Sequence, residues 1–269
     1  NILVNGKKAN CSYKVLKDDK IIVNDFQDSI ILKPQDIPLD IKYEDDYIIV
    51  LNKQKNLLTH PTPNQLKTTL VNALMFHFGN CLSDIDDDPL RRGIVHRLDK
   101  NTAGLMICVK NNDAHLNLKE QIKNKTAIRK YRAVVYGVLE KDEGIIDLPL
   151  KRCLKDAVKF SVAQNDDESA KKAITFYKVI ERFDGATYVE LELKTGRTHQ
   201  IRAHMSYLNH PLVGDTLYGS KGFKHNLLNK IKTNEQVLQS YYLKFVHPKS
   251  GDIMEFELPY SDWDGDIKK

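Results

Sequence analysis

The order of predicted strands and helices restricts the fold of this chain more than any other feature. Short apolar runs typical of strands recur at residues 47–51, 104–109, 131–136, 174–180, 188–193, 240–246 and 253–258. Helical spacing of apolar residues is found at residues 66–78 and 112–122, and again after Thr198, which we expect to cap a third helix. Strands and helices do not alternate as in a βαβ fold. The order predicts an α+β fold with a mixed, largely antiparallel central sheet and flanking helices.

Composition restricts the class of protein only loosely. The chain has 269 residues, 41% of them apolar, which is enough for one large domain or two smaller ones. Lys and Arg exceed Asp and Glu by five, a mild excess that fits a polyanionic partner but is weak evidence for one. The four cysteines lie far apart without C-x-x-C spacing, which argues against a zinc site or a disulfide framework.

No run of about 18 apolar residues is present, so we expect no membrane-spanning helix. Cysteine usage of this kind is typical of a reducing compartment. We therefore expect a cytoplasmic protein, and we expect it to be monomeric.

The first segment that suggests chemistry is residues 93–105. His96, Arg97 and Asp99 are set between two apolar runs, at 94–95 and 105–109. Charges beside core strands must be paired or must serve a function. From these residues alone, a structural ion pair at a strand end and a catalytic site both remain open.

The second segment is residues 193–205, which carries Arg202 at the edge of an apolar helix face. A guanidinium at the edge of a core needs a carboxylate partner. His199 and His204 are five residues apart with no H-E-x-x-H pattern, so we predict no metal site.

Four ordered blocks of the sequence resemble the RluA family of pseudouridine synthases. HRLDKNTAGL (96–105) is similar to the family's catalytic motif, and TGRTHQIRAHMSYLNHPLVGDTLYG (195–219) is similar to its C-terminal signature. Residues 43–61 are similar to its opening strand and loop, and KYRAVVYG (130–137) to its tyrosine strand. The resemblance covers residues 43–259. Two of the four blocks are long, so a chance match is implausible.

The resemblance implies a central active-site cleft in which uridine in RNA is isomerised to pseudouridine without a cofactor. Asp99 would be the catalytic carboxylate, acting by attack on the sugar, attack on the base or removal of a sugar proton. Arg202 would pair with Asp99 and keep it ionised. Tyr131 would stack on the uracil ring.

The resemblance also implies several substrate contacts. Arg97 would fill the space left by the extruded uridine, with a phosphate contact or a surface ion pair as the alternatives. Independently of the resemblance, Arg129 is one of several basic residues that are candidates for phosphate contacts. His96 is expected to hold the catalytic loop near the substrate and Leu212 to line the pocket. Thr102 and Gly104 belong to the same catalytic motif. Asn56 stands where the family commonly has Gly, and it can adopt the left-handed conformation of Gly.

The expected domain organisation has three parts. Residues 1–25 resemble the end of an alpha-L RNA-binding domain, whose first half we expect to precede Asn1; residues 26–42 would be a linker and residues 43–269 the catalytic domain. A plain β-hairpin is the alternative for the first segment. The alpha-L resemblance favours large-subunit ribosomal RNA as substrate, with transfer RNA second.

Two other classes of protein were weighed. A catalytically idle RNA-binding factor for ribosome assembly could use the same scaffold, although Asp99, Tyr131 and Arg202 are all present. A glycoside hydrolase would need a second acid working with Asp99, and the sequence offers no convincing candidate.

Overall fold

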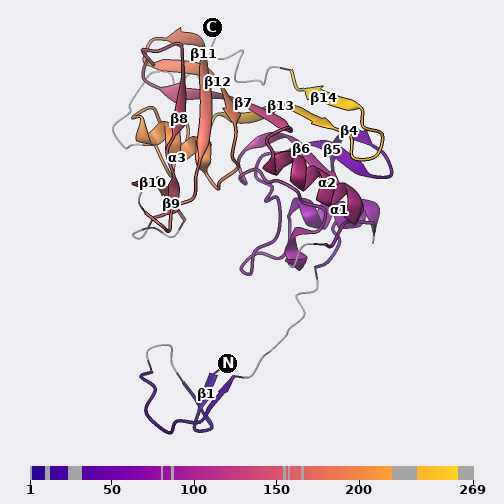
Figure 1. Ribbon diagram of the computed structural model, residues 1–269, viewed down its shortest axis with the longest axis vertical. Coiled ribbons are helices and arrows are strands. Elements are labelled where there is room, and N and C mark those ends of the chain that lie inside the picture. Colours follow the sequence, from indigo (N-terminus) through magenta and orange to yellow (C-terminus); the bar gives the residue numbers. More distant parts are fainter. Residues whose placement is uncertain are drawn as a thin grey trace. The chain divides into compact units, whose positions relative to one another are not determined.

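The structure is a computed structural model (Figure 1) that describes residues 2–9, 13–23, 32–79, 81–85, 88–153, 156, 158–164, 167–219 and 235–259. The chain divides into two compact units, residues 1–32 and 33–269.

The first unit contains a small antiparallel sheet of three strands in the order β2-β1-β3. Its strands are β1 (Ile2–Val4), β2 (Lys7–Lys8) and β3 (Ile21–Val23). Asn5 and Gly6 form the turn between β1 and β2 with φ angles of 52° and 78°, the left-handed values that a tight hairpin turn requires. The Asn5 side chain accepts the Lys20 N–H at 2.9 Å, which joins the turn to the residue before β3.

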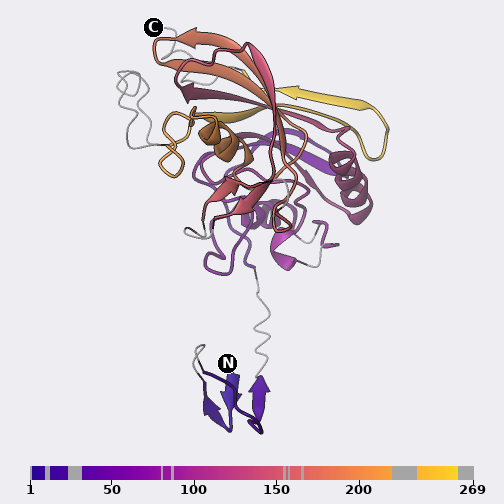
Figure 2. The same cartoon turned by 60° about the vertical axis from the view of Figure 1, so that its left-hand side comes forward.

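The second unit is built on a nine-stranded sheet (Figures 1 and 2). Its order is β4-β5-β6-β13-β7-β12-β11-β8, with β14 paired to β13. The strands are β4 (Asp40–Glu44), β5 (Ile48–Lys53), β6 (Ala103–Val109), β7 (Ile128–Tyr136), β8 (Glu143–Asp147), β11 (Ile174–Phe183), β12 (Ala186–Leu193), β13 (Leu238–Val246) and β14 (Ile253–Glu257). A separate hairpin pairs β9 (Leu150–Arg152) with β10 (Phe160–Val162). Only the β6–β13 pair is parallel among the described strands, which confirms the expected mixed, largely antiparallel sheet.

Three α-helices flank this sheet in the described part of the chain: α1 (Leu70–Phe78), α2 (Asn112–Lys123) and α3 (Gln200–Tyr207). A short 3₁₀ turn, η1, spans Pro89–Arg91. In Figures 1 and 2, α2 lies against β6 and α3 lies beside β11, so these two helices pack on different parts of the sheet. Buried residues of β5, β6, α2 and β13 form one continuous apolar core, which includes Ile48, Ile107, Leu118 and Phe245.

Two helix starts differ from the sequence-based prediction. α1 begins at Leu70 rather than residue 66 because Thr69 and Asn72 form a reciprocal capping box. Thr198 does not cap α3, so that prediction is wrong. The cap is His199, in a left-handed conformation (φ 55°, ψ 21°) and without a side-chain capping bond. The Gln200 side chain closes this turn instead, by accepting the N–H of Arg197 at 3.0 Å.

Residues 33–42, part of the segment expected to be a linker, make contacts within the second unit. Gln35 N–H donates to the Asn72 carbonyl at 3.0 Å, and the Asn72 side chain donates to the Lys33 carbonyl at 2.9 Å. β4 begins at Asp40 and pairs with β5.

The centre of the sheet, where β6 meets β13, is unusually close-packed. A Cβ on Gly104 would lie 2.2 Å from the Ser240 carbonyl oxygen, so only glycine allows the two strands to approach this closely. β13 in turn pairs with β7. The loop before β6 and the side chains of β7 are thereby brought together at the middle of the sheet.

Candidate active site

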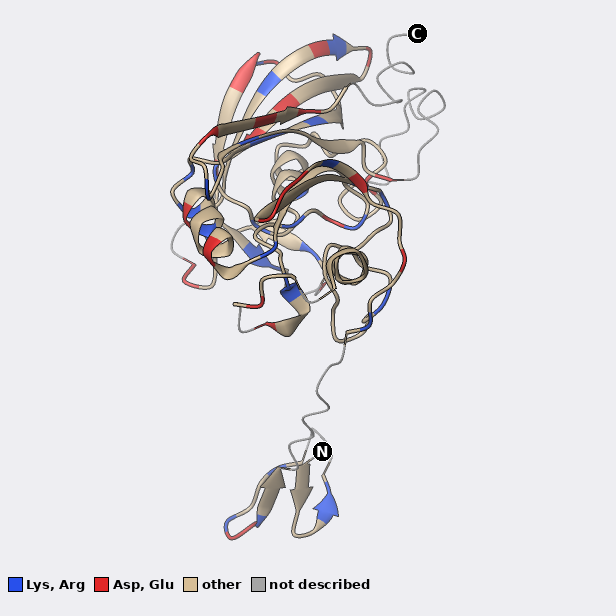
Figure 3. Cartoon of the chain, turned by 90° about the vertical axis from the view of Figure 1, so that its right-hand side faces the viewer, with Lys and Arg blue, Asp and Glu red and all other residues tan. Residues whose placement is uncertain are grey.

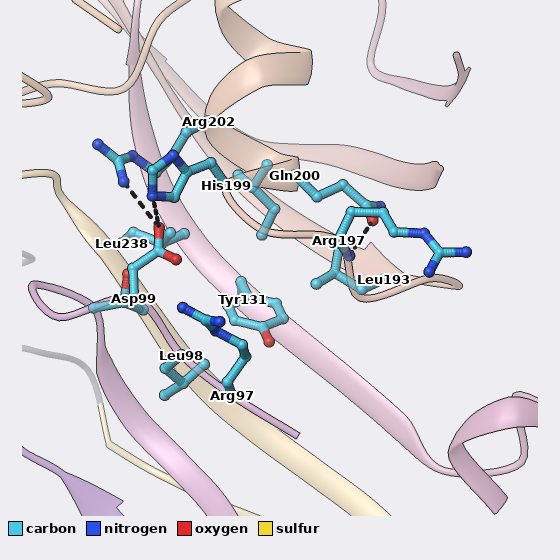
Figure 4. A pocket seen from close by; sticks show the side chains of 12 residues that line it. Arg97, Leu98, Asp99, Tyr131, Leu193, Arg197, His199, Gln200, Arg202 and Leu238 are labelled. Atoms are coloured by element: carbon cyan, nitrogen blue, oxygen red, sulfur yellow. Dashed lines mark hydrogen bonds and ion pairs between the residues drawn. The ribbon is translucent and has the colours of Figure 1, made fainter. Parts of the chain in front are cut away.

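A cavity opens where the loop before β6, strand β7 and the start of α3 meet (Figure 4). Its lining contains five of the residues singled out in the sequence: Arg97, Asp99, Thr102, Tyr131 and Arg202. The other lining residues are Leu98, Leu193, Arg197, His199, Gln200, Ile201 and Leu238. Segments more than a hundred residues apart in sequence therefore form one site.

Asp99 sits in a tight turn immediately before β6. The Thr102 N–H donates to the Asp99 carbonyl at 3.1 Å, which closes the turn. The Thr59 hydroxyl binds both backbone polar groups of Leu98, the residue before Asp99. It donates to the Leu98 carbonyl at 2.8 Å and accepts the Leu98 N–H at 3.2 Å. The carboxylate is thus held on a loop with restrained backbone.

A buried lysine is a second anchor of this loop. The Lys53 ammonium, on a residue only 1% exposed, donates to the carbonyls of Gln54 and Leu57, each at 2.9 Å, and of Lys100 at 3.2 Å. Three carbonyls match the three donors of an ammonium group. Lys53 therefore ties the end of β5 to the turn that carries Asp99.

Arg202 joins two carboxylates that differ in exposure. Its Nη1 donates to Asp99 Oδ2 at 2.9 Å, while its Nε and Nη2 donate to the two oxygens of Asp215 at 2.6 and 2.9 Å. The Asp215 side chain is fully buried, Arg202 is 8% exposed and Asp99 is 18% exposed. Burial opposes the charge of Arg202, but the hydrogen bonds and charges of Asp215 and Asp99 raise the pKa of its guanidinium above the usual value.

Asp215 is a site residue that the sequence analysis did not identify. Besides the two bonds to Arg202, its Oδ1 accepts the backbone N–H groups of Leu217 and Tyr218, both at 3.0 Å. It fixes the orientation of Arg202 and leaves one guanidinium nitrogen for Asp99. The only signal in the sequence was an acidic residue thirteen positions after the arginine.

Tyr131 is on β7 and is 4% exposed, opposite Ser240 of β13. Burial raises the pKa of its phenol, against the opposing effect of the nearby Arg129 charge. The phenol is therefore protonated at neutral pH. Its ring borders the same cavity as Asp99 (Figure 4).

Arg97 is exposed and lines the cavity. It has no hydrogen bond or ion pair with the residues that the structure describes. Thr102 is 2% exposed, and its hydroxyl accepts from the Gln236 side chain at 3.2 Å.

Four other predicted substrate contacts are not among the cavity-lining residues. His96 is buried behind the loop, where its Nε2 accepts the Ile107 N–H at 3.1 Å. Burial and, less strongly, Arg129 lower the pKa of His96 to about 3, so its ring is neutral. Leu212 is fully buried and bridges to Val135 of β7. Gly104 serves the close approach of β6 and β13.

Arg129, the fourth, is two residues before Tyr131 on β7 and is 5% exposed. Its Nε is buried without a hydrogen-bond partner, and its guanidinium lies against Gly196, 3.2 Å from where a Cβ would be. No carboxylate of the described chain pairs with it. A buried cation without a counter-ion is costly, and such a group is suited to receive an anion.

His199 was not singled out as a substrate contact in the sequence. Its Nε2 lies 3.9 Å from Asp99 Oδ2, and its Nδ1 lies 3.1 Å from the Tyr218 hydroxyl. The Asn56 prediction is confirmed, since this residue has a φ of 63°.

Within the described ranges, no group of three or more His, Cys, Asp or Glu side chains could hold a metal ion. In the same ranges no helix has the length and apolar character needed to cross a membrane.

Comparison with known proteins identifies the class of this fold and site. The family model described as RNA pseudouridylate synthase matches residues 47–207. The fold is shared with two human proteins, RNA pseudouridylate synthase domain containing 1 (TM-score 0.64, 23% identity, covering 83% of this chain and 84% of that one) and domain containing 4 (TM-score 0.66, 20% identity, covering 84% and 90%).

Two relatives are similar over most of the chain. The RNA pseudouridine synthase YlyB of Bacillus subtilis is 42% identical over 96% of this chain and 81% of its own length. Ribosomal large subunit pseudouridine synthase D of Vibrio cholerae is 41% identical over 93% of this chain and 76% of its own length. The chain belongs to the RNA pseudouridylate synthase family, and within it to the RluA group that the sequence motifs resemble. It is an isomerase that converts uridine in RNA into pseudouridine.

Proposed function

We propose that this chain modifies large-subunit ribosomal RNA, with Asp99 as its catalytic carboxylate and Tyr131 and Arg202 as the residues that complete the site. The observation that carries the assignment of residues is the shared guanidinium of Arg202, which joins partly exposed Asp99 to buried Asp215 at the wall of the cavity.

The reaction is an internal rearrangement. The bond between N1 of uracil and C1′ of ribose breaks, the base turns, a bond forms between C5 and C1′, and the C5 proton is lost while N1 gains one. No electrons are gained or lost overall and no group is donated. The proposal therefore includes no cofactor.

Asp99 has one carboxylate oxygen free to act on the nucleotide. Arg202 occupies Oδ2, while Oδ1 makes no hydrogen bond with the described residues. Arg202 is the counter-ion of this carboxylate, whose side chain is 18% exposed. A charged and free oxygen on a restrained loop suits each of the three roles considered for Asp99: attack on the sugar, attack on the base or removal of a sugar proton.

Tyr131 supplies an aromatic face for the uracil ring and a protonated phenol at its edge. Stacking holds the detached base in place while it turns in its own plane, because the same face of the base then stays against the Tyr131 ring. Chemistry on a stacked base also requires the nucleotide to leave its helix. Exposed Arg97 at the cavity mouth is placed to contact the RNA at that point.

The substrate class rests on the relatives and on the first unit of the chain. Proteins named ribosomal large subunit pseudouridine synthase D are 38–41% identical over most of this chain, in Vibrio cholerae and Escherichia coli among others. We assign residues 1–25 to the end of an alpha-L RNA-binding domain and the second unit, which begins at Lys33, to catalysis, so that a linker would be limited to residues 26–32. A cytoplasmic monomer acting where ribosomes are made fits this proposal.

Pseudouridine mapping of total RNA from cells with and without this gene tests the proposal. We expect pseudouridine to disappear from specific positions of large-subunit ribosomal RNA. A loss confined to transfer RNA would contradict the substrate. An unchanged map with altered ribosome assembly would favour the idle RNA-binding factor instead.

A further inference from the structure

His199 is held in an uncommon backbone conformation at the edge of the cavity. Left-handed φ values are rare for residues other than glycine, and they cluster at functional sites. The Gln200 side chain stabilises this conformation by three hydrogen bonds. Its oxygen accepts the Arg197 N–H at 3.0 Å and the Thr195 hydroxyl at 2.7 Å, and its nitrogen donates to the Ile174 carbonyl at 3.0 Å. The imidazole is thereby directed towards Asp99 (Figure 4).

A hydrogen-bond chain behind His199 determines which ring nitrogen carries the proton. The Phe160 N–H donates to the Tyr218 hydroxyl oxygen at 2.7 Å. The phenol hydrogen must then be donated elsewhere, and the acceptor within reach among the described residues is His199 Nδ1, at 3.1 Å. Nδ1 is thus an acceptor, and the hydrogen of the neutral ring is on Nε2.

Both groups in this chain keep these protonation states near neutral pH. Burial raises the pKa of Tyr218 to about 12. Burial also lowers the pKa of His199, although Asp99 opposes this. The cavity therefore contains a fixed donor, His199 Nε2–H, next to a fixed acceptor, the Asp99 carboxylate.

The two groups are too far apart to bond directly, at 3.9 Å from Nε2 to Oδ2. One oxygen atom about 2.8 Å from each would fit beside them at ordinary hydrogen-bond distances. That atom must accept from Nε2–H and donate to the carboxylate. A water molecule can do both, and among the groups of a bound nucleotide only a hydroxyl group can.

The groups of a uridine inside an RNA chain differ in this respect. The uracil carbonyls only accept and would be repelled by the carboxylate, N3–H only donates, and the phosphates carry the wrong charge. The 3′ and 5′ oxygens are esterified. The ribose 2′-hydroxyl alone both accepts and donates, and it is the group that distinguishes RNA from DNA.

We propose that His199 and Asp99 together bind the 2′-hydroxyl of the target nucleotide, with Tyr218 fixing the imidazole tautomer that this requires. His199 is then a residue that selects ribose over deoxyribose. The inference rests on the proposed role of Asp99 and adds the sugar specificity of the same site.

The test compares two RNA fragments that carry the mapped target position as uridine or as 2′-deoxyuridine. The measured quantity is the single-turnover kcat/KM for pseudouridine formation. We expect the wild-type chain to prefer uridine about tenfold, the effect of one hydrogen bond to a charged or polar partner. In His199→Asn, kcat/KM for the uridine fragment should fall to the value that the wild-type chain has for the deoxyuridine fragment. For the deoxyuridine fragment, kcat/KM of the variant should be less than threefold below that of the wild-type chain. Asparagine tolerates the left-handed backbone, but its side chain is too short to reach.

Tyr218→Phe is the second variant, because it keeps the ring and removes only the hydroxyl that orients His199. Tyr218→Phe should lose part of the preference for the uridine fragment over the deoxyuridine fragment. A melting curve for each variant checks that it folds. If His199→Asn folds and still prefers uridine over 2′-deoxyuridine tenfold, the inference is overturned. If His199→Asn does not fold, the same result in Tyr218→Phe overturns it. Equal rates of wild type on both fragments also overturn it, while leaving the proposed function intact. Failure of wild type on uridine itself counts against the proposed function.

Discussion

Arg202 links two carboxylates, one that lines the cavity and one that is fully buried. Asp215 is fully buried and uses both oxygens on Arg202, whereas Asp99 remains partly open to the cavity and shares a single oxygen. Two carboxylates around one guanidinium give this triad a net negative charge, beside the Arg97 and Arg197 guanidinium groups that also line the cavity. The guanidinium that pairs with Asp99 is thus held by a residue that does not line the cavity.

Replacing Asp215 should therefore damage both stability and catalysis. In Asp215→Asn we expect the free energy of unfolding to fall by about 3 kcal/mol, because a buried guanidinium loses its main counter-ion. Isomerisation should slow at least tenfold. Urea unfolding and single-turnover assays measure the two effects.

Asp142→Asn is the matched control, since Asp142 pairs with Arg182 at 2.7 Å but its side chain is 85% exposed. Exposed pairs of this kind contribute less than about 1 kcal/mol. Equal losses of stability in the two variants would contradict the role assigned to Asp215.

His96 should make the fold sensitive to acid. Its pKa in the folded chain, about 3, is below the ordinary value near 6.5 because the ring is buried. Below pH 6.5 the unfolded chain therefore binds a proton that the folded chain does not, and stability falls by up to about 1.4 kcal/mol per pH unit. His96→Gln, which retains an acceptor for the Ile107 N–H, should lose stability less steeply between pH 6.5 and 5. Urea unfolding at both pH values gives the slopes; identical slopes for the two chains would contradict the prediction.

Single motifs in the sequence predicted the cavity-lining residues Asp99 and Arg202 but not the residues that support them. Asp99 and Arg202 stand out because charges adjoin apolar runs, and their pairing was expected from the family resemblance. Asp215, Tyr218 and Lys53 gave no such signal. Each acts through a contact made only when distant segments meet, such as Lys53 with the carbonyl of Lys100, so local sequence does not reveal the partner.

At the scale of elements, the turn before β6 depends on anchors from the β5 end. Lys53 and Thr59 bind the carbonyls on the two sides of Asp99, at Lys100 and Leu98. These contacts restrict the backbone of a loop that has no regular secondary structure. A catalytic group that is held in the productive geometry speeds the reaction more than the same group on a mobile loop.

Lys53→Met should loosen this turn while preserving most of the buried volume. We expect kcat to fall about tenfold with little change in RNA affinity, because the chemistry depends on the position of Asp99 and binding is spread over the surface. Gln54→Ala is the control, since it removes an exposed side chain and leaves the carbonyl that Lys53 binds. Similar kcat values for the two variants would argue against the anchor.

The longer strands and all three helices were predictable because each carries its own apolar period. β4 and β8–β10 were not. β4 and β8 are five residues each and β9 and β10 three, and most of their residues are at least partly exposed. Their hydrogen-bonding partners, rather than their composition, make them strands.

At the scale of the whole molecule, charge is distributed rather than concentrated. Figure 3 shows basic and acidic residues interspersed along the strands of the second unit. Several form cross-strand ion pairs, such as Lys130 with Glu190 at 3.1 Å. The net charge of +5 therefore gives only modest general attraction to RNA. Under the proposed domain assignment, selectivity comes from the cavity and from the first unit.

Removing residues 1–32 separates these contributions. A chain that begins at Lys33 retains the whole nine-stranded sheet and its apolar core. We expect an unchanged urea midpoint for that core and activity within threefold on a short RNA fragment. Affinity for long ribosomal RNA should fall about tenfold in filter binding, as expected for loss of an RNA-binding module. Unchanged affinity for the long RNA would contradict that assignment.

The decisive measurement is RNA binding and pseudouridine formation by Asp99→Asn in one assay. Asparagine has nearly the same shape as aspartate but lacks the negative charge that pairs with Arg202. The account predicts binding within a few-fold of wild type and no detectable product. Product formed at a rate within tenfold of wild type would show that the charged oxygens of Asp99 are not what drives the isomerisation.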